Sequence, residues 1–205
     1  MAVMLAVLGS TAADLAWSNS TAHGAPTPQT TPKPKPKTTT TQPQPPPVPK
    51  AYILVDGDSG VVLDGRNLHL PLPPASTVKV MTGLTALQRL SDDAMITVSE
   101  RAAAMPAMKI GLHAGEVWPI KDIIHTVFMV SANDSAYALA ENASGTIEAF
   151  AADMASTAAR LGMLDSSFAD PAGLDDTASL AGGSRMSVYD LAIAARNALS
   201  IPQIA

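Results

Sequence analysis

Ser76 and Lys79 have the residue types and the spacing for nucleophilic catalysis by a serine with a lysine as its base. The sequence predicts a helix from Ser76 to about Leu90, and residues three apart on a helix share one face. A serine at a helix start also lies near unpaired backbone N–H groups and the positive end of the helix dipole, which stabilise negative charge on an attacked carbonyl oxygen.

The lysine can accept a proton near neutral pH only if burial or a nearby cation lowers its pKa. The apolar residues after Lys79 make partial burial the expectation. The alternative is that Ser76 only caps the helix, which serine does well. Roughly one Ser-x-x-Lys arises by chance in a chain of this length, so the pair alone leaves both interpretations open.

A second polar group, Ser131 to Asn133, interrupts two apolar segments that are predicted to be helical, 121–130 and 135–143. A serine hydroxyl there can relay a proton, and an asparagine amide can bind a substrate carbonyl or hold the lysine. The alternative is that these residues cap the following helix.

The elements that must position these groups follow from hydrophobic periodicity and turn residues. Two β-rich runs around Gly-Asp-Ser-Gly predict a hairpin over 51–65. Helical periodicity recurs further along the chain, with Gly162 ending one helix and the loop Asp-Pro-Ala-Gly-Leu-Asp-Asp preceding the last. The pattern predicts an α/β protein whose later helices cover 146–161 and 187–199.

Composition excludes several function classes. The chain has 205 residues, a formal net charge of −5 and no cysteine. The folded part has no basic face to suggest nucleic-acid binding. The absence of cysteine excludes disulfides and thiol nucleophiles, and it fits an exported bacterial protein. The four histidines show no metal-type spacing, so neither a metal nor another cofactor is expected.

Two segments precede the predicted folded part, 51–205. Residues 1–24 combine a short apolar run with small polar residues, which is typical of a secretory leader, although no basic region precedes the run. A disordered apolar terminus is the alternative. Residues 25–50 hold ten prolines and predict an extended Pro/Thr-rich stalk. A ligand for an aromatic-lined groove is the other interpretation. Membrane association is expected only through the leader.

Several segments together resemble the serine D-alanyl-D-alanine carboxypeptidases, the low-molecular-weight penicillin-binding proteins. Ala-Tyr-Ile-Leu-Val-Asp is similar to the family's opening hairpin, and PPASTVKVMTGLTAL resembles its nucleophile segment. The stretch around Ser131 to Asn133, and the helix and loop over 154–176, also match in order and spacing. The resemblance implies the DD-peptidase/β-lactamase-like fold and an extracytoplasmic, cell-envelope or secreted location.

Carried over by residue, the resemblance implies Ser76 as the acylated nucleophile and Lys79 as its general base. It implies that Ser131 relays the proton and that Asn133 contacts substrate. The substrate would be a peptidoglycan stem peptide that loses its terminal D-Ala, and β-lactams would acylate the same serine. Class A β-lactamases also use a downstream glutamate. The corresponding stretch, LDSSFADPAG, has none, which favours the peptidase.

One family element is absent from the sequence. No Lys-Thr-Gly follows Ser131, since the last lysines are Lys109 and Lys121. The family's C-terminal strands are therefore expected to be missing, and the only predicted strands are those of the 51–65 hairpin. Three accounts follow: a C-terminally truncated enzyme, a degenerate relative, or strands supplied by a partner. The alternative function is a catalytically incomplete, stalked envelope protein that binds peptidoglycan peptide or penicillin weakly or not at all.

Overall fold

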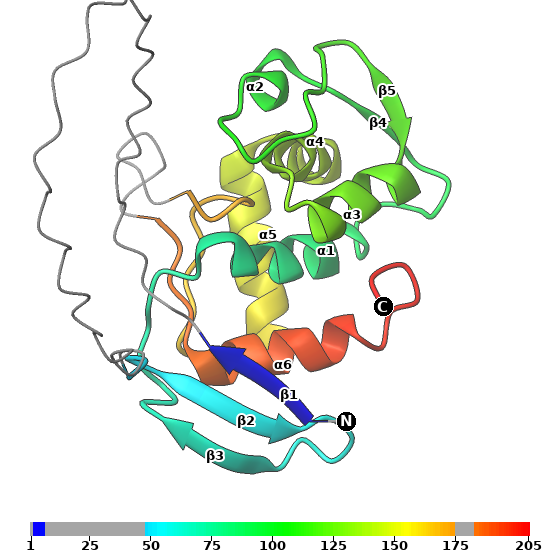
Figure 1. Cartoon of the computed structure of the whole chain (residues 1–205). Helices are drawn as coiled ribbons and strands as arrows, with labels where there is room; N and C mark the ends of the chain where they lie inside the picture. Colours follow the sequence, from blue (N-terminus) through cyan, green and yellow to red (C-terminus); the bar gives the residue numbers. More distant parts are fainter. Residues whose placement is uncertain (1, 7–47, 175–182) are drawn as a thin grey trace, which may run out of the picture. The chain divides into compact units, whose positions relative to one another are not determined.

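A small antiparallel sheet and a group of packed helices make up the fold of this computed structural model (Figure 1). The structure describes residues 2–6, 48–174 and 183–205. Most of the predicted leader and stalk lies outside these ranges, so both interpretations stay predictions. Among the described residues, no helix is long and apolar enough to span a membrane.

The sheet has the order β1-β2-β3, with β1 at Ala2–Ala6, β2 at Tyr52–Asp56 and β3 at Val62–Arg66. The predicted hairpin is confirmed as β2 and β3. The expectation that it would be the whole sheet is wrong, because β1 pairs antiparallel with the other edge of β2. The apolar run interpreted as part of a leader thus satisfies backbone groups that an edge strand leaves unpaired.

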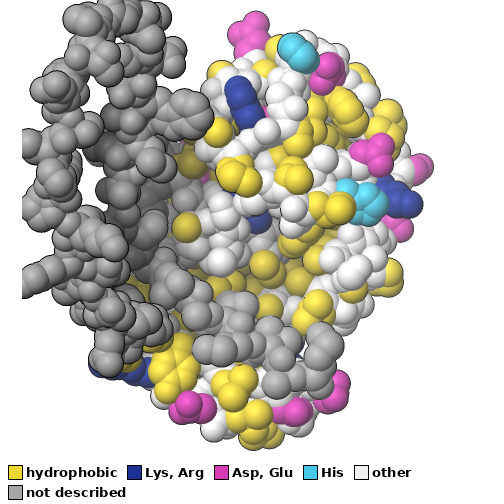
Figure 2. Space-filling view, viewed as in Figure 1, with side chains coloured by type: hydrophobic (Ala, Val, Ile, Leu, Met, Phe, Trp, Pro, Cys, Tyr) yellow, Lys and Arg dark blue, Asp and Glu magenta, His cyan; other side chains and the backbone are white. Residues whose placement is uncertain are grey.

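Alternation along β2 turns Ile53 and Val55 inward, and both are buried against the last helix, α6 (Val188–Ala198). On β3, Val62 and Leu63 are 37% and 56% exposed. Figure 2 shows apolar side chains at the surface of this sheet end of the molecule. The sheet is therefore packed on one side, as an antiparallel sheet allows.

The helices enclose the main core, which includes Met81, Leu139 and Phe150. In Figure 1, α5 runs behind α1 from the α4 end of the molecule to α6. Thr146 and Ser187 cap α5 and α6 by accepting backbone N–H groups of the first turn. The bounds are α1 Lys79–Ala86, α2 Glu100–Ala103, α3 Ile120–Met129, α4 Asn133–Ser144, α5 Ile147–Arg160 and α6 Val188–Ala198.

The predicted helix from Ser76 to about Leu90 is shorter and begins differently. A 3-10 turn, η1, spans Ala75–Val78, and the α-helix α1 ends at Ala86. Residues 91–120, which the sequence left as mixed, contain the two-stranded sheet of β4 (Met95–Thr97) and β5 (Val117–Pro119). This sheet carries no residue of the predicted site.

Candidate active site

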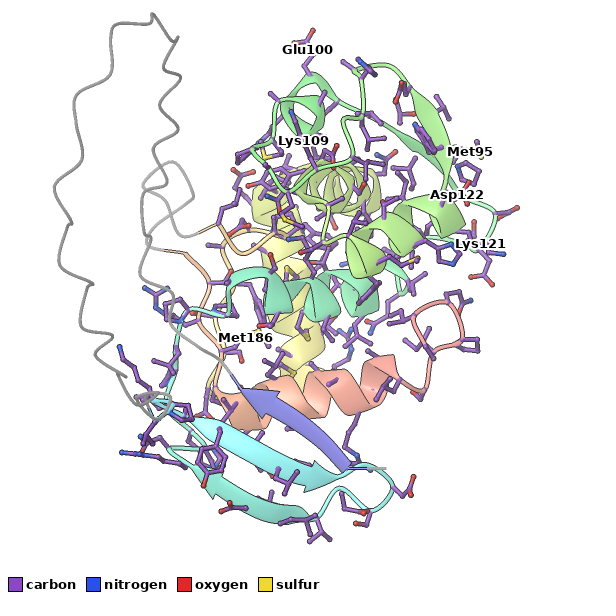
Figure 3. All side chains as sticks on the ribbon, viewed as in Figure 1. Met95, Glu100, Lys109, Lys121, Asp122 and Met186 are labelled. Atoms are coloured by element: carbon purple, nitrogen blue, oxygen red, sulfur yellow. The ribbon has the colours of Figure 1, made fainter. Side chains whose placement is uncertain are left out.

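Ser76 lies in the η1 turn, at the junction of the Pro-rich loop and α1. Its side chain is exposed, whereas Val78 and Lys79 after it are buried. Ala75 has a positive φ of 47°, which an L-residue adopts only when its surroundings fix it. Upstream, the backbone groups of Leu72 and Met186 exchange hydrogen bonds of 3.0 and 2.9 Å. Figure 3 shows Met186 between α1 and α6, so this bridge ties the loop before Ser76 to the body of the fold.

Lys79 is only 3% exposed, and its ammonium group donates three hydrogen bonds. Its Nζ lies 3.1 Å from Ser76 Oγ, 2.8 Å from Asn133 Oδ1 and 2.9 Å from the Ala172 backbone oxygen. The three acceptors come from η1, the start of α4 and the loop after α5. The structure thus brings Ser76, Lys79 and Asn133 together.

The chemistry of these acceptors decides what happens when Lys79 loses a proton. A neutral amine keeps two N–H donors and gains one lone pair. The Asn133 and Ala172 oxygens carry no hydrogen, so they can only accept. The lone pair therefore faces the Ser76 hydroxyl, the one neighbour of the three that can donate. The arrangement can remove a proton from Ser76.

Burial lowers the pKa of Lys79 to about 8, because the charged form loses its hydration. The negative charge of Asp170 opposes this by raising the same pKa. With a pKa of about 8, on the order of a tenth of the lysine is neutral at pH 7. A solvated lysine near 10.5 would be almost fully protonated, so this environment makes Lys79 a usable base.

Asn133 is 4% exposed, and hydrogen bonds at both its amide oxygen and its amide nitrogen fix the orientation of the side chain. Its Nδ2 donates to the Pro106 backbone oxygen at 3.1 Å, which leaves Oδ1 for Lys79. Its backbone N–H donates to the Met108 oxygen at 2.7 Å. Ser131 is half-buried and has a positive φ of 58°. Within the described residues no hydrogen bond joins its hydroxyl to Ser76 or Lys79, so the relay role stays a prediction.

Sequence reasoning missed a third group, the turn 170–174. Besides the Ala172 oxygen, it supplies the Pro171 oxygen, which accepts from Thr82 Oγ1 on α1 at 2.7 Å. The signal for a turn was present in Asp-Pro-Ala-Gly. No pattern in the sequence showed that this turn would contact Lys79.

Comparison with known proteins decides the family. The family model for D-alanyl-D-alanine carboxypeptidase matches residues 37–204. The chain belongs to this family. The resemblance inferred from the sequence is thereby confirmed, and the residues that meet at Lys79 all lie within the matched range.

Curated relatives and solved structures agree with this assignment. The chain is 34% identical over 160 residues to D-alanyl-D-alanine carboxypeptidase DacF of Bacillus subtilis, covering 76% of this chain and 40% of that protein. It is 32% identical over 157 residues to DacB2 of Mycobacterium tuberculosis, covering 76% and 52%. A crystal structure of a D-alanyl-D-alanine carboxypeptidase from M. tuberculosis superposes with a TM-score of 0.71 at 29% identity, covering 76% and 58%.

Penicillin-binding protein 6B from Escherichia coli superposes with a TM-score of 0.67 at 28% identity, covering 79% of this chain and 54% of that one. The predicted DD-peptidase-like fold is thus confirmed. The chain spans between 40% and 58% of the lengths of these four relatives. It therefore shares the family and the fold with proteins that are considerably longer.

Proposed function

We propose that the chain carries the acyl-transfer machinery of a serine D-Ala-D-Ala carboxypeptidase that acts on peptidoglycan stem peptides outside the cytoplasm. The observation that carries the proposal is the Lys79 amine, which lies 3.1 Å from Ser76 Oγ between two oxygens that can only accept. The names of the relatives support the substrate class. The leader-like pattern of residues 1–24 supports export of the protein.

The proposed reaction begins with neutral Lys79. As Ser76 Oγ attacks the carbonyl carbon of the penultimate D-Ala, its proton passes to Lys79 Nζ and an Oγ–C bond forms. The C–N bond then breaks, and the departing amine of the terminal D-Ala takes a proton from the lysine, either directly or through Ser131. Water next attacks the ester carbonyl carbon and gives a proton to Lys79. The C–Oγ bond then breaks, Ser76 Oγ takes that proton back, and the shortened peptide leaves with a new carboxyl end. Asn133 holds the lysine and offers its amide to the substrate.

Intact-mass spectrometry of the purified full chain with benzylpenicillin tests this proposal. We expect one covalent adduct per chain in the wild type and none in Ser76→Ala. The control Ser200→Ala removes another exposed hydroxyl and should leave the adduct intact. Circular dichroism of each variant establishes that it is folded. An adduct that persists in Ser76→Ala would place the acylated group elsewhere.

The alternative inferred from the sequence is a stalked envelope protein without catalysis. A folded wild-type chain that forms no adduct and releases no D-Ala from a stem-peptide analogue would support this candidate against the enzyme.

A further inference from the structure

Asp170 is a buried carboxylate that organises the turn beneath the site. Its side chain is 1% exposed. Its Oδ1 accepts the backbone N–H groups of Ala172 at 2.7 Å, Gly173 at 2.8 Å and Leu174 at 3.3 Å. Its Oδ2 is buried without a hydrogen-bond partner among the described residues. A carboxylate buried in this way is costly, so its retention calls for a physical reason.

The turn that Asp170 holds touches α1 and η1 at three points. The Ala172 oxygen accepts from Lys79 Nζ, and the Pro171 oxygen accepts from Thr82. Gly173, with a φ of 78°, lies against Ala75, because a Cβ on it would be 1.9 Å from the Ala75 oxygen. Any shift of this turn would therefore move an acceptor of the lysine and a support of the residue before Ser76.

We propose that Asp170 is a positioning residue for Lys79, because it fixes the turn that presents the Ala172 oxygen to the amine and places a negative charge beside it. The inference rests on the proposed function, since it gives Asp170 a role through the lysine that serves Ser76. Asp170 itself touches no reacting atom in this arrangement. It holds in place one of the acceptors that direct the lysine lone pair toward Ser76, and its charge decreases the fraction of the lysine that is neutral.

The neighbours of Lys79 differ in charge, which shows where the electrostatic effect of Asp170 on the lysine comes from. From η1 it faces the neutral Ser76, and from α4 the neutral amide of Asn133. The carboxylate of Asp134 on α4 is directed instead to the backbone N–H groups of the 110–112 loop. Among the described residues, Asp170 is the charged group that acts on the pKa of Lys79, and it raises that pKa.

The coupling acts in both directions. Burial raises the pKa of the Asp170 carboxyl, while the N–H groups of Ala172, Leu174 and Gly173 and the charge of Lys79 lower it. Each member of the pair thus favours the charged form of the other. Removing the charge of Asp170 must lower the pKa of Lys79 below its present value of about 8.

The decisive experiment is an NMR titration of the lysine ¹³Cε resonances in the full chain, comparing the wild type with Asp170→Asn. The amide keeps an oxygen acceptor for the turn but removes the charge. We expect the midpoint of Lys79 to fall by on the order of one pH unit, as for the loss of a close opposite charge. The control Asp122→Asn removes an exposed carboxylate on α3, which Figure 3 shows well apart from the turn, and should leave the midpoint unchanged.

An unchanged Lys79 midpoint in a folded Asp170→Asn variant would overturn the proposal. If that variant does not fold, a titration of the wild-type chain tests the proposal instead. Its Asp170 ¹³Cγ resonance must show an inflection at the pH where Lys79 titrates, and a featureless curve there would overturn the proposal equally. Neither readout requires substrate.

The rate of benzylpenicillin acylation against pH is measured separately. In Asp170→Asn the acid limb of this pH profile should move to lower pH. Absence of acylation in every variant counts against the proposed function only.

Discussion

Burial of Lys79 makes the free energy of unfolding depend on pH in a defined window. The lysine has a pKa of about 8 in the folded chain and its ordinary value of 10.5 when unfolded. Below about pH 8 both states bind the proton, and above 10.5 neither does. Between these values the unfolded state binds more protons, so stability rises with pH. At 1.36 kcal/mol per pH unit of difference, the gain from Lys79 is ~3 kcal/mol across the window.

Urea unfolding followed by circular dichroism, at several values from pH 8 to 10.5, measures this gain. The matched variant is Lys79→Met, which keeps the length of the side chain but cannot titrate. Other groups also contribute to the pH dependence; the hydrogen bond to Asp64, for example, raises the pKa of Tyr52 in the folded chain. Both proteins carry them, so their effect cancels in the difference between wild type and variant. We expect that difference to shift by ~3 kcal/mol in favour of the wild type as pH rises. Parallel curves would refute the claim that the fold desolvates this lysine.

Two further substitutions test the contacts around the lysine. Gly173→Ala combines a positive φ with a Cβ 1.9 Å from the Ala75 oxygen, so it should lower the free energy of unfolding by about 2 kcal/mol or more in urea unfolding. Gly115→Ala has a similar φ but nothing within 4 Å of the new Cβ, so it should cost only about 1 kcal/mol. Equal losses in the two variants would contradict a steric clash between residue 173 and Ala75. Asn133→Ala removes a buried acceptor of Lys79 and should cost about 1–3 kcal/mol in the same assay; an unchanged stability would show that this hydrogen bond contributes nothing.

The helices and the hairpin could be predicted because their signals are local. Alternation in β2 and the turn residues before β3 define the hairpin. Apolar periodicity defines α3 and α5 almost to the residue. The proximity of Ser76 and Lys79 was predictable for the same reason, since three residues of helical or 3-10 geometry fix it.

The remaining contacts could not be predicted because they join distant residues through tertiary packing. Asn133 is 54 positions from Lys79, and the Ala172 oxygen is 93 positions away. A backbone oxygen has no sequence signature at all. Asp170 has the appearance of an ordinary turn residue before proline. The pairing of β1 with β2 was missed because a short apolar run at a chain start fits a leader equally well.

The groups proposed to transfer the proton from Ser76 lie close together around the Lys79 amine. Among the described residues, the groups that hydrogen-bond the Lys79 amine lie between residues 76 and 172, within the range matched by the family. In the proposed reaction, proton abstraction from Ser76 therefore uses η1, α1, α4 and the 170–174 turn. Acylation by a strained β-lactam relies mainly on the nucleophile and its base. It therefore tests these groups more directly than peptide cleavage, which also requires the end of the peptide to be bound.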